Sequence, residues 1–469
     1  MRRRLLICLL ALLPLSASAR MAESLRVDKS AVPAHDLAEI RSTGVLRVLI
    51  NQNRNSSAIV KGQAVGTEQQ RLRAFEQYLN RDNSRKLSIK LIPKAKNQLL
   101  PALLRGEGDL VVPGELLNPS KDQTVSASRA LHAQVPLVLV SAKGARRYLR
   151  LQQLAGRSLT LAQGSAADEA VRQVNQQLAE RQLAPILIEW ADPSLAVEDV
   201  LEMVQAGVYP LTAVELPIAE RWAKVMPKLR IDRHLQLDNR SDMQWYLSRQ
   251  APMLGATLER FLQSYVSPAD QDAAFLRVNR RAYRVHNPLA RADRQKLEKL
   301  RPLLQRHASQ NNFDWLSLAA LAYKESSFNP RARSGNAPSG LMQITASAAQ
   351  SVGVSNRQTL EGNVQAGAKY MSMLRRRFFA SPQIAESERL AFVLAAYNMG
   401  PERVQGLRAE ARRRGLNPNQ WFFQVERVAM EQVGMGVVGY VSSVNKYQLA
   451  FARERASLER SKSPAKVAK

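Results

Sequence analysis

The chain has 469 residues, a length that favours two domains over a single core. It holds one cysteine, Cys8, and its five histidines show no metal-ligand spacing, so neither disulfides nor thiol catalysis nor a metal or other cofactor is expected. The formal net charge of +28 suits an acidic partner such as nucleic acid, anionic lipid or an anionic wall polymer.

The N-terminus is typical of a secretory signal. Arg2-Arg3-Arg4 precede an apolar run from Leu5 to Leu15, and Ala17-Ser18-Ala19 follow as a cleavage site, so we expect a signal peptide at 1–19. Losing three arginines with the signal would leave a charge of +25. No later stretch approaches the roughly twenty apolar residues of a membrane helix. We therefore predict an exported, periplasmic protein, which argues against nucleic acid as partner.

The first half of the chain alternates short apolar runs with helical patterns, which is a β/α rhythm. The apolar runs predict strands at 44–50, 87–92 and 136–140. The periodic segments between them predict helices at 68–79 and 98–104. This order is typical of a doubly wound parallel sheet.

Four short motifs in this half, at 40–48, 66–68, 105–111 and 151–159, resemble those of extracellular solute-binding proteins of the amino-acid type. The resemblance implies an α/β two-lobed periplasmic-binding-protein fold over residues 36–265, whose lobes close on a ligand about crossing strands. The candidate crossings are Pro136-Leu137-Val138 and Leu211-Thr212-Ala213.

The ligand of this module stays open at the level of the sequence. Where the family has an arginine that clamps the ligand carboxylate, this chain has Asp122, which would repel the carboxylate of an amino acid. Lys121 or Arg129 could substitute for the arginine. The alternatives are a cell-wall peptide and no small ligand at all.

In the second half, Glu325 ends a helical pattern that Asp314 can cap. Leu318, Leu321, Ala322 and Glu325 fall on one helix face, so the carboxylate is expected to be buried. Burial raises the pKa of a carboxyl group toward the range of a general acid at neutral pH. The alternative is a structural glutamate at a frayed helix end, paired with a nearby arginine.

Four motifs follow one another in this half: Glu325-Ser326, Gly340-Leu341-Met342-Gln343, Ala396-Tyr397-Asn398 and Gly439-Tyr440-Val441. Their order and spacing resemble the mainly α lysozyme-like domain of the soluble-type lytic murein transglycosylases. Together with the preceding solute-binding-like module, the chain resembles the family of membrane-bound lytic murein transglycosylase F. We place the junction at 283–289, the lysozyme-like domain at 285–452, and a basic tail, expected to be disordered, at 453–469.

The resemblance implies that peptidoglycan glycan strands are the substrate and that Glu325 acts first as acid and then as base. It would cleave the bond between N-acetylmuramic acid and N-acetylglucosamine and form a 1,6-anhydromuramoyl end. Peripheral attachment to the outer membrane is also implied. The same resemblance implies a substrate-binding role for the remaining motif residues, which are Ser326, Gly340, Met342, Gln343, Tyr397, Asn398 and Tyr440.

Individual roles follow from chemistry. The amides of Gln343 and Asn398 suit N-acetyl and hydroxyl groups, and the phenol of Tyr440 can position the acetamido group or Glu325. Ser326 is expected to cap locally or to bond to the acid, and Tyr397 either faces the groove or packs in the core. Gly340 and Met342 are expected to shape the backbone and wall of the cleft.

Two other functions remain open in the sequence. A goose-type lysozyme would use water as nucleophile, but ordinary glycosidases need a second carboxylate, and the remaining candidates lie in polar surroundings typical of the surface: Glu361, Glu386, Glu388 and Glu402. A non-catalytic wall-binding receptor would not need a buried acid. We further hypothesise that ligand closure of the first module alters access to Glu325.

Overall fold

The computed structural model describes residues 35–81, 85–117, 124–332 and 338–459. The predicted signal peptide, Lys121 and Asp122 lie outside these residues. Within the described part, no helix is long and apolar enough to cross a membrane.

The first lobe is built on a five-stranded sheet with the order β4-β1-β5-β12-β6. β1 pairs in parallel with β4 and β5, whereas β12 runs antiparallel to β5 and β6. The elements of this lobe are α1 (Leu37–Thr43), β1 (Val45–Asn51), α2 (Arg54–Ser57), β2 (Ile59–Val60), β3 (Gln63–Ala64), α3 (Thr67–Leu79), β4 (Ser88–Lys94), α4 (Leu99–Leu104), β5 (Leu110–Val112), β6 (Val125–Ala127), β12 (Tyr246–Ser248) and α8 (Pro252–Ser264).

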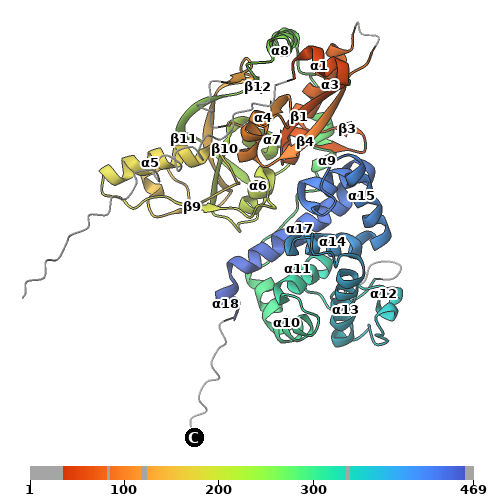
Figure 1. The fold of residues 1–469 in the computed structure, drawn as a ribbon. Coiled ribbons are helices and arrows are strands. Elements are labelled where there is room, and N and C mark those ends of the chain that lie inside the picture. The colour runs from red at the N-terminus through yellow and green to blue at the C-terminus, as the bar shows by residue number, and fades with distance from the viewer. Residues whose placement is uncertain (1–34, 82–84, 118–123, 333–337, 460–469) are drawn as a thin grey trace, which may run out of the picture.

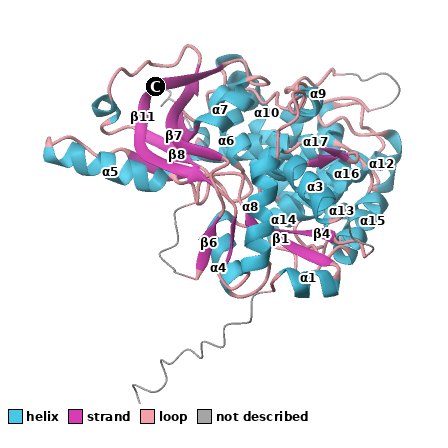
Figure 2. Cartoon of the chain, turned by 90° about the horizontal axis from the view of Figure 1, so that it is seen from above, coloured by secondary structure: helices cyan, strands magenta, loops and turns pink. Residues whose placement is uncertain are grey.

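The second lobe has a three-stranded antiparallel sheet, β10-β7-β11, and a parallel pair, β8-β9. Figure 2 shows β7, β8 and β11 gathered apart from β1 and β4 of the first lobe. Its elements are β7 (His132–Ala142), β8 (Ser158–Leu161), α5 (Ala167–Glu180), β9 (Leu187–Trp190), α6 (Val197–Gln205), β10 (Leu211–Glu215), α7 (Leu216–Ala223) and β11 (Leu229–Met243).

The two lobes confirm the predicted two-lobed α/β fold, with two differences. The five-stranded sheet is mixed and the three-stranded sheet is antiparallel, so the expected doubly wound parallel arrangement is limited to β4-β1-β5 and β8-β9. The chain enters the second lobe through β7, which includes Pro136, and returns through β11, where Met243 pairs with His132. The predicted crossing at 211–213 is wrong, because β10 pairs with β7 inside the second lobe. A short apolar run has the same pattern in a core strand as in a crossing strand.

The second module is helical and surrounds a buried central helix, α11 (Trp315–Ser326). Every residue of α11 from Trp315 to Tyr323 is buried, so the helix is enclosed on all sides and not only along the predicted stripe. Around it lie α10 (Arg291–Gln310), α12 (Ala346–Ser351), α13 (Leu360–Phe378), α14 (Glu386–Met399), α15 (Pro401–Arg413), α16 (Glu426–Gln432) and α17 (Met435–Arg453), while α9 (Ala273–Asn279) precedes the linker.

The tail expected to be disordered from residue 453 is helical as far as residue 459. Arg453 is the last residue of α17, and α18 (Arg455–Glu459) follows. Leu458 is fully buried, Arg455 forms an ion pair with Asp314, and Trp315 donates to Glu459 at 3.1 Å. The prediction is therefore wrong for 453–459, because one apolar side chain and two polar contacts fix this short helix. Residues 460–469 are not described.

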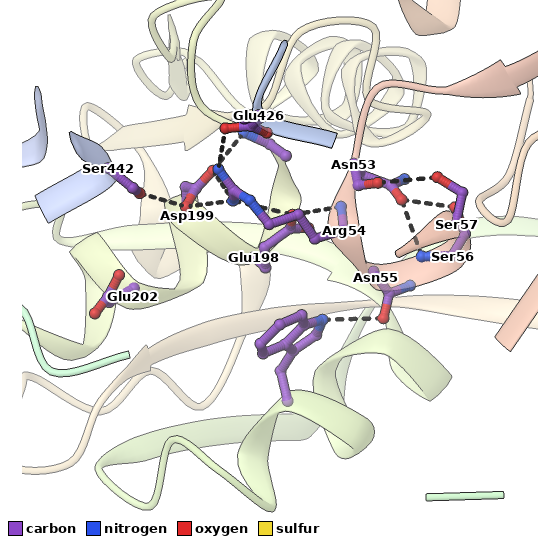
Figure 3. A network of polar contacts seen from close by, with 12 residues as sticks. Asn53, Arg54, Asn55, Ser56, Ser57, Glu198, Asp199, Glu202, Glu426 and Ser442 are labelled. Atoms are coloured by element: carbon purple, nitrogen blue, oxygen red, sulfur yellow. Dashed lines mark hydrogen bonds and ion pairs between the residues drawn. The ribbon is translucent and has the colours of Figure 1, made fainter. Parts of the chain in front are cut away.

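The two modules meet at α17, which runs beneath α6 in Figure 1. Arg54 of the first lobe lies 2.9 Å from Asp199 and 3.4 Å from Glu198, both on α6, and 3.4 Å from Glu426 on α16 (Figure 3). On α17, Lys446 lies 2.6 Å from the same Asp199. All five side chains are buried. The junction therefore contains a compact cluster of charges, here called the junction cluster, that joins both lobes to the second module.

Candidate active site

Glu325 lies in the last turn of α11, and its carboxylate is held by the neighbouring helix. The hydroxyl of Tyr440, on α17, donates a hydrogen bond to Glu325 Oε1. Asp314 caps the other end of α11 as predicted, accepting from the backbone N–H of Leu316 at 3.1 Å. A buried helix with a fixed start and a phenol donor at its end thus sets the position of the carboxylate.

The surroundings of Glu325 act on its proton affinity in opposite directions. Burial raises the pKa of Glu325 above its ordinary value, while the hydrogen bond from Tyr440 and the charge of Lys324 lower it. The net shift is upward, which keeps more of the acid protonated at neutral pH. The pKa of the Tyr440 phenol is also raised, by burial and by the neighbouring Glu325. Tyr440 therefore stays a hydrogen-bond donor.

The chain leaves α11 through a strained turn. Ser327 and Phe328 both have positive φ, at 50° and 61°, a region that residues with a side chain rarely adopt. Phe328 is 2% exposed and packs against Tyr323, so burial of its ring holds the turn in place. Strained backbone of this kind is concentrated at functional sites in proteins.

Ser326 joins this turn to the Gly340 loop. Its hydroxyl donates to the carbonyl oxygens of Ala322 at 3.0 Å and Leu341 at 2.9 Å, and it accepts from the N–H of Asn329 at 3.2 Å. The side chain is therefore engaged by backbone and makes no hydrogen bond to Glu325 in the described structure. Its contribution to the site is to fix the loop beside the acid.

The loop itself needs glycine at residue 340. Gly340 has φ +80°, and a Cβ there would lie 2.4 Å from the amide nitrogen of Asn363 on α13. That amide donates to Ser339 O at 2.8 Å, and its oxygen accepts from Met342 N at 2.8 Å. Asn363 thus braces the loop from behind, a role that the sequence did not reveal because its partners lie more than twenty residues away.

The Gly340 loop is held by contacts of three predicted site residues, Met342, Gln343 and Tyr397. Met342 is fully buried, and its carbonyl oxygen accepts from the Tyr397 hydroxyl at 2.8 Å. The amide nitrogen of Gln343 donates to Ala332 O at 3.1 Å and Gly340 O at 2.8 Å. Gln343 therefore has only its side-chain oxygen left for a ligand. The Tyr397 ring is half-buried and meets Tyr370 edge-on at 5.6 Å.

Asn398 is the predicted substrate-binding residue with the most freedom to bind. It is exposed at the end of α14, and its amide has no hydrogen-bond partner among the described residues. Both its donor and its acceptor are available for a ligand. Its neighbour Tyr397 joins the same helix end to the Gly340 loop through the hydrogen bond to Met342 O.

Three of the four other candidate acids are held by other groups, whereas Glu402 is exposed in the first turn of α15 and has no hydrogen-bond or ion-pair partner among the described residues. Glu361 lies 2.7 Å from His307, and Glu386 forms ion pairs with Arg375 and Arg389. Glu388 was expected at the surface, but it is half-buried and accepts from Trp421 N at 2.7 Å, and burial raises its pKa to about 7.

The position of Glu388 argues against a role as second catalytic carboxylate. It lies at the start of α14, whereas Tyr397 and Asn398 lie at the end of this helix. At the rise of an α-helix, nine residues span roughly 14 Å, so Glu388 lies at the end of α14 away from these two residues. Its backbone hydrogen bonds also hold it against the Trp421 segment.

The lobes of the first module meet over a buried charge cluster at the ends of their strands. Lys96, just after β4, lies 2.9 Å from Glu115 of the same lobe and 3.8 Å from Glu215 at the end of β10 in the other lobe. Asn51 and Asn53 donate to Glu115 at 2.8 Å and 2.5 Å. This is the edge where ligands bind in open α/β sheets. Arg129 instead lies 4.0 Å from Glu259 on α8.

Comparisons with known proteins show which family and which named proteins the chain is similar to. Residues 302–420 match the family described as "Transglycosylase SLT domain". Three similar proteins are each named "Membrane-bound lytic murein transglycosylase F". That of Desulfosudis oleivorans is 27% identical and is aligned over 82% of each chain. That of Vibrio cholerae is 29% identical over 83% of this chain and 73% of its own. That of Cronobacter sakazakii is 24% identical over 88% of this chain and 80% of its own.

Solved structures match the first module at low similarity. An amino acid ABC transporter substrate-binding protein of Streptococcus pneumoniae, bound to L-arginine, is 17% identical with a TM-score of 0.40, covering 51% of this chain and 96% of its own. A solute receptor for L-cysteine of Neisseria gonorrhoeae is 14% identical with a TM-score of 0.42, over 52% and 93%. The two-lobed fold is established by the sheets described above. The sequence matches confirm the predicted family resemblance and enzyme class.

Proposed function

We propose that this protein is a lytic transglycosylase that cleaves the bond between N-acetylmuramic acid and N-acetylglucosamine in peptidoglycan, leaving a 1,6-anhydromuramoyl end. One observation carries the proposal. Glu325 is a carboxyl group with a raised pKa, fixed by Tyr440, and no second described carboxylate is among the groups that shift this pKa. A lone acid suits a reaction in which the sugar supplies its own nucleophile.

The reaction needs two proton transfers at Glu325. The protonated carboxyl group gives its proton to the glycosidic oxygen as the bond from that oxygen to the anomeric carbon breaks. The resulting carboxylate then takes the proton of the muramoyl 6-hydroxyl, whose oxygen bonds to the anomeric carbon. No water is consumed, and Glu325 ends in its starting protonation state. Because nucleophile and electrophile belong to one sugar, the second step gains from effective molarity.

Tyr440 supports both halves of this cycle. Its phenol donates to Glu325 Oε1, so it stabilises the carboxylate that forms after the first proton transfer. It also fixes the direction of the carboxyl group without giving up its own proton, since burial raises the pKa of the phenol well above the ordinary value. We assign Tyr440 as a positioning residue for the acid.

Substrate contacts are assigned to the groups that remain available. Asn398 offers an exposed amide with no described partner, and Gln343 offers its side-chain oxygen. These suit the N-acetyl and hydroxyl groups of the two sugars. Tyr397 and Met342 form wall, and Ser326 and Gly340 hold the loop in position.

For the first module, bounded at 36–265, we propose a cell-wall peptide as ligand. The ammonium of Lys96 lies between Glu115 and Glu215 of opposite lobes, and an amine of a wall peptide could take its place between these carboxylates. The second domain is placed at 285–452. The export signal at 1–19, a periplasmic location and peripheral attachment at the outer membrane remain proposals that suit a wall-degrading enzyme.

The test is mass spectrometry of sugars released from purified peptidoglycan by the mature protein and by Glu325→Gln. We expect anhydromuropeptides from the first and none from the second. Products heavier by one water would replace the proposal with a lysozyme-type hydrolase. Absence of soluble products from the native protein would favour a wall-binding sensor instead.

A further inference from the structure

A cavity of about 620 Å³ lies beside the linker between the two modules. Lys228, from the loop before β11, lines one side, and the linker residues Arg280 and Arg284 line another. Asp293 of α10 and Tyr323 of α11 also contribute to its surface. Both modules and their linker thus build this cavity, which is separate from the residues assigned to the glycan groove.

The cavity carries uncompensated positive charge. Lys228, Arg280 and Arg284 have no acidic partner among the described residues. The acid in the lining, Asp293, accepts from the Tyr323 hydroxyl at 2.9 Å and from Lys296 at 2.9 Å, so it is already engaged. Exposed basic residues are common in a chain of charge +28. Here they converge on a hollow, where their fields add and attract an anion.

The cavity also has apolar and aromatic walls. Buried side chains of Val225, Tyr283, Val285 and Tyr323 lie between the basic residues. The volume falls within the range of pockets that hold small organic molecules, about 300 to 1,000 Å³. Apolar and aromatic walls with cations at the rim suit a ligand with carboxylates on a partly apolar chain, such as a short acidic peptide.

The cavity and the catalytic acid share one helix end. Tyr323 lines the cavity and lies two residues before Glu325. At about 100° per residue, side chains two positions apart point to nearly opposite sides of a helix. Glu325 therefore faces Tyr440 on one side of α11, and the cavity opens on the other side.

We propose that this cavity is an exosite for the acidic stem peptides of peptidoglycan, an inference that rests on the proposed function. The carboxylates of a stem peptide pair with Arg280, Arg284 and Lys228, and the peptide chain lies along the tyrosine walls. Holding a stem there raises the local concentration of glycan at Glu325. The site acts on binding of the polymer and takes no part in the proton transfers.

The test compares the double variant Arg280→Gln/Arg284→Gln with Arg281→Gln, in the full mature chain. Arg281 is an exposed neighbour that does not line the cavity, so its loss controls for removal of a linker charge outside the cavity. We expect the double variant to raise KM for intact peptidoglycan about tenfold with little change in kcat, because two charged contacts are lost. Arg281→Gln should match the native protein. Lys228→Gln provides a second, single-site variant with a smaller change in the same direction.

Three substrates test whether the cavity binds the carboxylates of stem peptides: intact wall, glycan strands without stem peptides, and amidated wall. On glycan strands freed of stem peptides, and on wall whose peptide carboxylates have been amidated, the double variant should equal the native protein. An equal rise in KM on those substrates, or no rise on intact wall, would overturn the exosite. Sedimentation of Glu325→Gln proteins with wall, with and without the double substitution, measures the same binding without catalysis. A failure of the proposed function would remove products from every protein but leave this binding difference.

Discussion

Tyr440 and Glu325 come from helices more than a hundred residues apart in sequence, and the phenol of the first donates a hydrogen bond to the carboxylate of the second. The pair closes the site between α11 and α17. Because α17 also carries Lys446, which lies 2.6 Å from Asp199 in the first module, the helix that positions the acid is fixed at the module junction as well.

Removing the Tyr440 hydroxyl should slow the reaction and change its pH dependence. A hydrogen bond to a charged group is worth about 1.5–3 kcal/mol, so Tyr440→Phe should lower kcat by about ten- to a hundredfold. The bond lowers the pKa of Glu325, so its loss should raise that pKa and move the alkaline limb of the kcat profile to higher pH. Tyr447→Phe, further along the same helix, is the control and should keep the native profile. An unshifted limb in Tyr440→Phe would contradict the assigned role.

Lys324 should tune the same acid through its charge. The ammonium lies 5.9 Å from the centre of the Tyr440 ring, and its charge lowers the pKa of Glu325. The other charged groups that act on Lys324 are Glu202 and Lys446. Lys324→Gln should therefore raise the pKa of Glu325 and extend activity to higher pH, while Lys324→Arg should leave the limb in place. The measurement is the pH profile of kcat for both variants. An alkaline limb at the same pH in Lys324→Gln and Lys324→Arg would refute the electrostatic effect.

The helical periodicity of the sequence was enough to place Glu325 at the end of a helix. It could not predict the role of Asn363, which depends on long-range contacts. The spacing of Leu318, Leu321 and Glu325 predicted the helix and its apolar face, since helical periodicity is a local property, although Glu325 itself is only half-buried. The bracing role of Asn363 depends on partners at Ser339 and Met342, which no spacing rule connects. A pattern within a short stretch can be recognised in the sequence, whereas a contact between residues far apart in the chain cannot.

The same limit applies to charged and apolar residues outside the motifs. Glu388 has polar neighbours in sequence, but the fold buries it against the Trp421 segment. Leu458 lies in a basic stretch typical of a disordered tail, yet it is fully buried in α18. In both cases the partner comes from tertiary packing, which overrides local composition.

Gly340→Ala should destabilise the second module. The substitution adds a Cβ at φ +80° and places it 2.4 Å from Asn363, which would break the brace of the loop. We expect a loss of about 1–3 kcal/mol in the free energy of unfolding. Gly406→Ala is the matched control, because this glycine lies inside α15 with nothing within 4 Å of an added Cβ. It should stabilise by about 0.5–1 kcal/mol. Denaturant unfolding measures the free energy of unfolding of both variants. Equal changes in Gly340→Ala and Gly406→Ala would contradict the assigned role of Gly340.

Arg54→Met should weaken the module junction more than any surface ion pair. It would leave Glu198, Asp199 and Glu426 buried without the guanidinium, at a cost of about 3–5 kcal/mol. Arg172→Gln, which removes an exposed partner of Asp168, should cost under about 1 kcal/mol. Unfolding curves measure both, and limited proteolysis should show earlier cleavage at the linker in Arg54→Met only. Unchanged stability of Arg54→Met would mean that the apolar contacts of the junction suffice without the cluster.

Stability of the protein should fall as the pH rises from about 4.5 to about 7. Burial raises the pKa of Glu198 from 4.5 to about 7, and burial does the same for Glu388. A carboxyl group whose pKa is raised by folding holds its proton more tightly in the folded state. Its contribution to the free energy of unfolding is therefore complete below the unfolded pKa and is lost as pH rises through the folded pKa.

Asp199 acts in another pH window, since its pKa is lowered to about 2 and its contribution is lost only in stronger acid. Glu388→Gln keeps an oxygen to accept from Trp421 but cannot ionise, so its free energy of unfolding should vary less between pH 5 and pH 7.5 than that of the native protein. An equally steep dependence in Glu388→Gln and in Glu198→Gln would place the titration elsewhere.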